Sequence, residues 1–147
     1  MKTALLNSSK KVYFGLVVVL FFALIANSFA QNQSIKDLGL SKNSSQSLVM
    51  GIHSDNNGVR ESSIYLVGKY RISDLEDELI SQLKVESESD IKVLIGLALF
   101  RMNSEKGMKE LQMLTAKDES PRVRRMSQAI YNEYLVNNFN RTADVKQ

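Results

Sequence analysis

The chain has 147 residues, one proline, no cysteine and a formal net charge of +3. This length suits one domain, and the absence of cysteine excludes disulfides, thiol catalysis and cysteine-ligated zinc or iron–sulfur sites. His53 is the single histidine, so the chain has no histidine pair for a metal site, and we expect neither a metal nor another cofactor.

Residues 1–30 have the pattern of a secretory signal peptide. Three lysines precede an uncharged apolar run over residues 12–26, and Ser28-Phe29-Ala30 follows it. This pattern predicts cleavage after Ala30 and export to the periplasm or out of the cell. The alternative is an uncleaved anchor in the inner membrane, but the apolar run is shorter than the about 20 residues that a bilayer span takes.

The predicted leader also accounts for the net charge. Its three lysines are the whole excess of basic residues, so residues 31–147 carry 16 basic and 16 acidic side chains. Proteins that bind nucleic acid need a basic face to neutralise phosphates, and we therefore expect no nucleic-acid partner. Export without cysteine favours a bacterial cell envelope.

The remainder of the chain is predicted to be all-α. Residues 31–46 are polar and are expected to form a flexible arm, and residues 140–147 a disordered tail. Between them, over residues 47–139, apolar residues recur at helical spacing and no segment alternates as a strand does. Five polar breaks divide this region into six helices, at residues 54–58, 71–74, 86–90, 102–107 and 117–121.

Two helix starts have recognisable capping residues. Ser73 and Glu76 have the spacing of a capping box, in which each side chain accepts a hydrogen bond from a backbone N–H. Ser120 precedes Pro121, the only proline, which suits the first position of a helix because its missing N–H costs nothing there.

A 32-residue repeat is the strongest pattern in the chain. Three predicted helices open alike, with Val59-Arg60, Ile91-Lys92 and Val123-Arg124. One helical hairpin per period is the signature of a stacked α-solenoid. The period predicts three units, at about residues 47–71, 72–103 and 104–139, and a compact helix bundle is the alternative.

These motifs resemble the HEAT-repeat family, including the short HEAT-like repeats of bacterial proteins. The second helix of that family begins roughly Asp-x-x-x-Val-Arg, and the first unit matches it at Asp55, Val59, Arg60 and Gly68. The resemblance implies stacked hairpins whose second helices line a concave face. It also implies that the basic ladder pairs with loop acids of its own or the next repeat, here Arg60, Lys92 and Arg124 with Asp55, Glu88 and Glu119.

A candidate partner-binding face follows from this arrangement. Positions just off the core stripe of the second helices are apolar, and we expect them to form a groove with a basic rim. The predicted groove residues are Tyr65, Leu94, Leu97 and Met126, with Lys69, Arg101 and Arg125 around them. The alternatives are that the patch is interior packing, or that residues 35–40 or the C-terminal tail cover it.

The other polar clusters favour structural roles. The acids at positions 74 and 76–78 suit the first turn of a helix, where they complement the dipole. His53 next to Ser54 and Asp55 is expected to belong to a helix end rather than to a catalytic triad. With no nucleophile–base pair, phosphate loop or metal triad in the sequence, we predict that the chain is not an enzyme and expect no small-molecule ligand.

The sequence therefore predicts an exported, non-catalytic interaction or scaffold module of the cell envelope with a protein partner. One alternative is an accessory or chaperone-like helper of an enzyme, because some HEAT-like proteins resemble chromophore lyases and their chaperones. Another is a membrane-tethered adaptor, in which the leader stays uncleaved and provides the only membrane contact.

Overall fold

A computed structural model describes residues 33–35, 37–39 and 41–144 of the chain. The chain divides into two units, Met1–Gln31 and Asn32–Gln147, and every described residue belongs to the second. The predicted signal peptide and its cleavage site lie outside the described residues. Within the described ranges, no helix has the length and apolar character needed to cross a bilayer.

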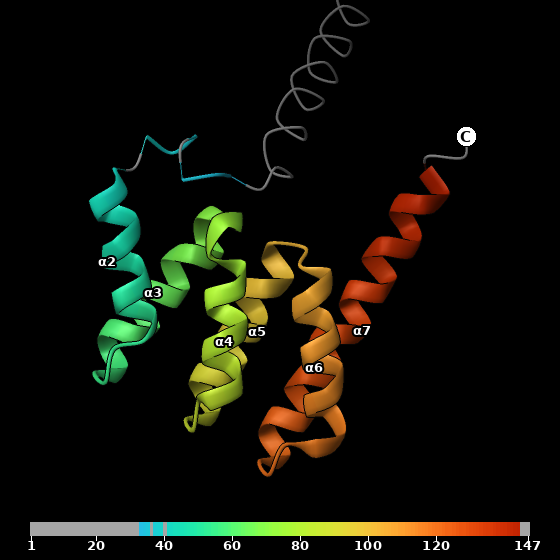
Figure 1. The fold of residues 1–147 in the computed structure, drawn as a ribbon. Helices are drawn as coiled ribbons and strands as arrows, with labels where there is room; N and C mark the ends of the chain where they lie inside the picture. The colour runs from blue at the N-terminus through green and yellow to red at the C-terminus, as the bar shows by residue number, and fades with distance from the viewer. Residues whose placement is uncertain (1–32, 36, 40, 145–147) are drawn as a thin grey trace, which may run out of the picture. The chain divides into compact units, whose positions relative to one another are not determined.

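The described residues are all-helical, as predicted, with six α-helices and no strand. A short 3₁₀ turn, η2 (Ser73–Leu75), precedes the third of them. The helices, shown in Figure 1, are α2 (Lys42–Ile52), α3 (Asn57–Tyr70), α4 (Glu76–Val85), α5 (Ser89–Arg101), α6 (Glu105–Lys117) and α7 (Pro121–Asp144). Each of the five predicted breaks therefore includes a junction between two helices, and four of them also overlap the end of a helix by one to three residues.

Side-chain caps explain where most of these helices begin. The residue before a helix accepts a hydrogen bond from the backbone N–H three positions on, which satisfies a donor that the helix itself leaves unpaired. The predicted cap before Pro121 is confirmed, since Ser120 Oγ accepts from the N–H of Val123 at 3.4 Å. The other caps of this kind are Ser41, Asn56 and Ser104.

The predicted capping box at Ser73 and Glu76 is wrong. Helix α4 begins at Glu76 after the 3₁₀ turn, and neither the turn nor the helix has a side-chain cap. The Ser73 backbone N–H instead donates to the Gln33 carbonyl at 3.1 Å. The Gln33 carbonyl thus accepts the hydrogen bond that the Glu76 side chain would accept in a capping box.

Residues 33–35, within the predicted arm, contact the helical domain. Gln33 forms a parallel bridge with Ile72, and its N–H donates to the Arg71 carbonyl at 3.0 Å. The carboxylate of Asp74 accepts from the hydroxyl of residue 34 and from the N–H of residue 35, both at 3.0 Å. The described part of the predicted arm, residues 33–35 and 37–39, is therefore attached to the helical domain.

The helical region extends beyond both of its predicted ends, residues 47 and 139. Helix α2 begins at Lys42, inside the segment predicted as an arm. Helix α7 continues to Asp144, so residues 140–144 of the predicted tail are helical. Residues 145–147 lie outside the described residues.

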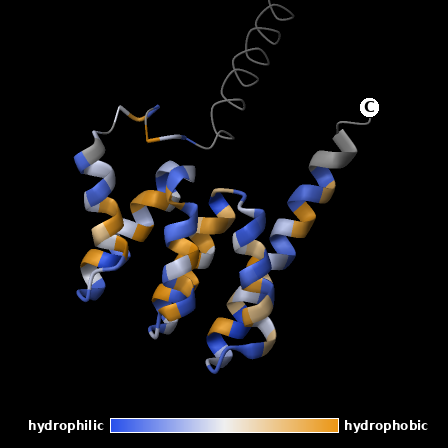
Figure 2. Ribbon diagram, in the orientation of Figure 1, coloured by the Kyte–Doolittle hydropathy of each residue, from blue (hydrophilic) through white to orange (hydrophobic). Residues whose placement is uncertain are grey.

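The helices pack in two layers. Consecutive helices pair as α2 with α3, α4 with α5, and α6 with α7. Across the pairs, α3, α5 and α7 contact one another in turn, as do α2, α4 and α6 (Figure 1). Each helix carries both hydrophobic and hydrophilic residues (Figure 2). The hydrophobic ones fill the space between the layers, with Ile64, Leu79, Ile91, Ile95 and Leu99 among the most buried.

The period predicted from the sequence recurs in the backbone. The second helices begin at Asn57, Ser89 and Pro121, which are evenly spaced along the chain at the interval of the repeat. The two described non-glycine residues with positive φ, Arg71 and Asn103, have the same spacing and follow α3 and α5. Each follows the end of a second helix, where a left-handed residue commonly terminates an α-helix.

Candidate functional site

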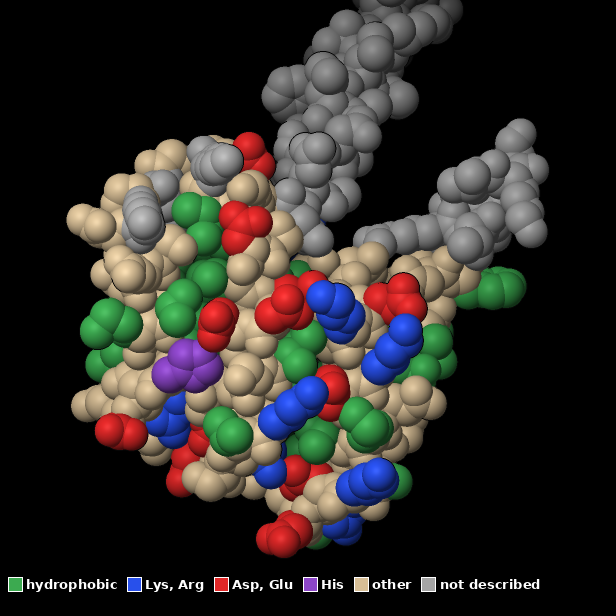
Figure 3. All heavy atoms as spheres, viewed as in Figure 1, with side chains coloured by type: hydrophobic (Ala, Val, Ile, Leu, Met, Phe, Trp, Pro, Cys, Tyr) green, Lys and Arg blue, Asp and Glu red, His purple; other side chains and the backbone are tan. Residues whose placement is uncertain are grey.

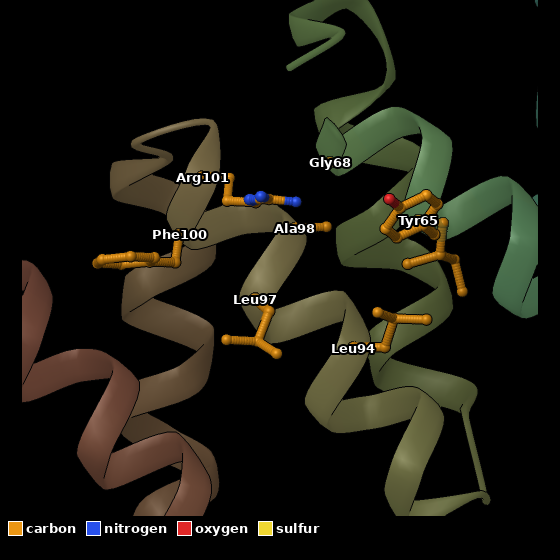
Figure 4. A pocket seen from close by; sticks show the side chains of 8 residues that line it. Tyr65, Gly68, Leu94, Leu97, Ala98, Phe100 and Arg101 are labelled. Atoms are coloured by element: carbon orange, nitrogen blue, oxygen red, sulfur yellow. The ribbon is translucent and has the colours of Figure 1, made fainter. Parts of the chain in front are cut away.

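Helices α3 and α5 approach each other closely at Gly68 and Ala98. A Cβ atom on Gly68 would lie 2.7 Å from the Ala98 Cβ and 2.8 Å from its Cα, which is closer than atoms can pack. Only glycine at position 68 therefore allows this contact. The larger side chains around the contact border a hollow at the surface between the two helices (Figure 4).

This hollow has a volume of about 340 Å³ and an almost entirely apolar lining. That volume lies near the lower end of the range of about 300–1,000 Å³ that is typical of ligand pockets. It brings together four residues that the sequence predicted for the groove, namely Tyr65 from α3 and Leu94, Leu97 and Arg101 from α5. Ile64, Gly68, Ala98 and Phe100 complete the lining.

A second hollow of about 470 Å³ adjoins the first. The two share Tyr65 and Leu94. The second is also lined by Leu66 and, nearer the N-terminal end of α3, by Glu61 and Ser62. We call the two together the α3–α5 groove. Tyr65 is 48 % exposed and Leu97 40 % exposed, so both apolar side chains face solvent.

The other predicted groove residues lie outside the lining. Lys69 Nζ lies 5.8 Å from the centre of the Tyr65 ring and 5.5 Å from that of Tyr70, which are cation–π distances. Lys69 thus adjoins the groove through Tyr65. Arg125 and Met126 are exposed on α7 and line neither hollow.

The sequence did not single out four residues of the first hollow as site residues: Ile64, Gly68, Ala98 and Phe100. Gly68 matched the HEAT-like motif, and that match was the available signal, since a glycine within a helix indicates close approach of another backbone. The offset of the repeat aligns Gly68 with Phe100, so it pairs a small residue with a large one. Both line the first hollow, one from each helix, and this depends on how α3 and α5 pack.

The sequence left open that residues 35–40 cover the groove. The described residues of this segment lie elsewhere. Leu38 lines a different hollow of about 710 Å³, together with Leu48 of α2 and Leu66 and Tyr70 of α3. Ile35 and Leu38 are partly buried against the core. The described residues 33–35 and 37–39 leave the α3–α5 groove uncovered.

Two ion pairs, each with a buried carboxylate, join successive predicted units. The Arg60 Nε donates to Glu86 at 2.7 Å, and the Lys92 Nζ donates to Asp118 at 2.6 Å. Burial by itself would raise the pKa of both carboxyl groups, but the hydrogen bonds that each receives from its basic partner and from backbone N–H groups hold the pKa below its ordinary value.

The resemblance implied Asp55, Glu88 and Glu119 as the acidic partners of this ladder, and that expectation is wrong, because the partners are Glu86 and Asp118. The observed acids are the C-cap residues of α4 and α6, one or two positions earlier than the expected Glu88 and Glu119. A C-cap side chain accepts backbone N–H groups of its own loop while facing the preceding unit. Arg124 donates to the backbone carbonyls of residues 118 and 119 instead of to a carboxylate.

His53 lies between two hydrogen-bond acceptors. Its Nδ1 is 2.9 Å from Gln82 Oε1, and its Nε2 is 2.8 Å from Glu78 Oε2. The hydrogen bond to Glu78, supported by the one to Gln82 and opposed by partial burial, raises the pKa of His53. The ring joins α2 to α4, and its described hydrogen bonds involve neither Ser54 nor Asp55.

The acids of η2 and of the first turn of α4 make separate contacts. Asp74 accepts hydrogen bonds from residues 34 and 35, Asp77 pairs with Lys106 of α6, and Glu78 binds His53. Acidic and basic side chains alternate over the face that α4 and α6 present in Figure 3. In the described part of the chain, no three histidine or acidic side chains gather as metal ligands would.

No family model, no curated protein and no solved structure matches the chain.

Proposed function

We propose that the chain is an exported HEAT-like solenoid that acts as a non-catalytic protein-interaction module of the cell envelope. Its partner segment binds on the face of the second helices, in the α3–α5 groove. The observation that carries this proposal is the apolar, solvent-exposed groove, which gathers Tyr65, Leu94, Leu97 and Arg101 around the Gly68–Ala98 contact. An exposed apolar hollow of this kind is typical of a partner-binding surface.

The repeated contacts support the solenoid arrangement. Arg60–Glu86 and Lys92–Asp118 each join residues 26 positions apart, and the second pair follows the first by one period of the repeat. The same contact between successive units is what a stacked repeat requires, because each unit then touches its neighbours in the same way.

The last unit differs from the others as a terminal unit should. The offset of the repeat aligns Gly96 and Phe100 of α5 with Gln128 and Asn132 of α7. Gly96 is buried against α6 and α7, whereas Gln128 and Asn132 are exposed and hydrogen-bonded to each other at 2.8 Å. Terminal units of solenoids carry a polar outer face, since no further unit covers them.

The proposal is tested by isolating the tagged full-length protein from the envelope of its own cells, with its bound proteins identified by mass spectrometry. We expect one stoichiometric partner that is lost in the variant Leu97→Glu. The matched control is Met113→Glu, because Met113 of α6 is similarly exposed, at 46 %, but lies in the other helix layer. Equal capture by both variants, or no stoichiometric partner, would contradict the proposal.

The same preparation tests the export that the proposal assumes. N-terminal sequencing is expected to begin at Gln31. A protein that retains residues 1–30 in the membrane fraction would contradict cleavage and make the chain a tethered adaptor.

A further inference from the structure

We propose that the segment bound in the α3–α5 groove is an acidic peptide, in which large apolar side chains enter the groove and a neighbouring carboxylate binds Lys69 and Arg101. This inference rests on the proposed function and adds the chemistry of the partner. It is carried by the distribution of charges around the groove.

Many basic side chains elsewhere in the described residues are paired with acids. Arg60 and Lys92 pair with the buried carboxylates of Glu86 and Asp118. On the outer surface, Lys84, Lys106, Lys109 and Arg122 each pair with an Asp or Glu at 2.8–3.2 Å.

The two cations at the groove differ from these. Within the described ranges, Lys69 and Arg101 have no acidic side chain within ion-pair distance, although both are exposed. Lys117 and Arg125 share this property, but neither lines the groove, as Arg101 does, and neither lies over the ring of a lining residue, as Lys69 does. Lys69 and Arg101 therefore offer positive charge to a ligand beside an apolar lining.

These two cations stand at one end of the groove. Lys69 lies in the last turn of α3, and Arg101 is the final residue of α5. Arg101 itself lines the apolar hollow, and Lys69 lies over the Tyr65 ring. The aliphatic parts of both side chains can cover an apolar ligand while the charged groups remain in water. A ligand carboxylate at this end of the groove would bind Lys69 of α3 and Arg101 of α5.

The other end of the groove has the opposite charge. Glu61, in the second turn of α3, lines the adjoining hollow. The charge along the groove therefore changes from basic near Arg101 to acidic near Glu61, with Tyr65, Leu94 and Leu97 between. A peptide with an acid on one side of its apolar residues matches this arrangement in a single direction, which gives specificity.

The same features disfavour other anionic partners. Adsorption to an anionic membrane takes a cluster of about 4–8 basic residues, and nucleic-acid binding needs many phosphate contacts. The groove has two cations beside an apolar lining. Such a surface suits one carboxylate next to apolar side chains. Arginine binds a carboxylate well because its planar guanidinium can donate two parallel hydrogen bonds.

The test is a selection of random 12-residue peptides displayed on phage against the immobilised full-length protein. We expect the selected peptides to contain an Asp or Glu within a few positions of two or more large apolar residues. Synthetic, fluorescently labelled copies of the selected peptides then give affinities by fluorescence anisotropy. We expect Arg101→Glu to weaken binding by about tenfold or more, which is the effect of losing one charged hydrogen bond.

Matched variants separate this inference from the proposed function. Arg125→Glu makes the same charge change on an exposed arginine outside the groove and is expected to leave affinity unchanged. A peptide with lysine in place of the acid should bind the native protein more weakly than the original peptide does, and should bind Arg101→Glu more tightly than it binds the native protein.

Each outcome has a defined consequence. Selected peptides that are apolar without an acid, and whose binding is lost in Leu97→Glu, overturn the acidic-peptide inference but leave the groove as a binding site. Peptides that bind Leu97→Glu as well as the native protein, or a selection that enriches no sequence, overturn both. Circular dichroism of each variant verifies that it is folded.

Discussion

The Arg60 guanidinium of α3 donates a 2.7 Å hydrogen bond to the Glu86 carboxylate, which lies 26 positions later at the end of α4. The Glu86 side chain is 2 % exposed, and it also accepts hydrogen bonds from Gln82 and from the backbone N–H groups of Ser87 and Glu88. One carboxylate thus joins α3 to the loop that starts α5.

Removing this carboxylate should destabilise the domain strongly. Glu86→Ala would leave the Arg60 charge buried without its partner, and such changes cost about 3–5 kcal/mol. The prediction is checked by urea unfolding followed by circular dichroism. The control is Glu88→Ala, two positions away and exposed, which is expected to change stability by less than about 0.5 kcal/mol. Equal effects of the two changes would contradict the assigned pair.

His53 should make stability depend on pH. Gln82 Nε2 donates to Glu86, so its Oε1 faces the His53 ring, and the other ring nitrogen faces the Glu78 carboxylate. Both neighbours accept hydrogen bonds, and only the protonated imidazolium donates from both nitrogens. The raised pKa of His53 agrees with this geometry.

The sign of the pH effect follows from this shift. Because folding raises the pKa of His53, the protonated ring stabilises the folded state. This contribution to the free energy of unfolding is complete below the unfolded pKa of 6.5 and is lost as the pH rises through the folded pKa. Because the His53 and Glu78 side chains are both at least a third exposed, we expect this contribution to be at most about 1 kcal/mol. Urea unfolding at pH 6 and pH 8.5 measures the loss. His53→Asn should show a smaller difference between the two pH values, and an unchanged difference would refute the assigned role of His53.

Gly68 should tolerate no side chain. Gly68→Ala places a methyl group against Ala98, where there is no flexible side chain to move away. We expect a loss of about 1–3 kcal/mol, as for other overpacked sites. Gly58→Ala in the same helix is the control, because its nearest contact is 3.4 Å away and the change should be neutral or stabilising by up to about 1 kcal/mol. Thermal unfolding compares the two variants.

Asp74 should hold residues 33–35 on the domain. Its carboxylate accepts two hydrogen bonds from this segment. In Asp74→Ala we expect the amide N–H of Ile35 to exchange faster with solvent, while protection in α5 stays unchanged. Hydrogen exchange followed by mass spectrometry detects this. Asp77→Ala, which removes an exposed acid of the next turn, is the control, and faster exchange in both variants would argue against a specific anchor.

Local patterns in the sequence were enough to predict the helices. Apolar spacing, the polar breaks and the cap at Ser120 act within a few residues, so they predicted six helices in the correct order. The offset of the repeat also placed Tyr65, Leu94, Leu97 and Arg101 on related helix faces, and the tertiary structure brings these four residues into one hollow.

Contacts between distant segments could not be predicted in this way. The choice of Glu86 over Glu88 depends on which carboxylate faces the preceding unit, and the failed capping box at Ser73 depends on Gln33, far earlier in the chain. The described residues of the predicted arm include few apolar side chains, and the attachment of this segment depends on the packing of Ile35 and Leu38 against the core.

The sequence by itself determined the helices and their repeat, because these depend on neighbouring residues. Only the tertiary structure decided the ion-pair partners and the shape of the α3–α5 groove, because these depend on how the helices pack.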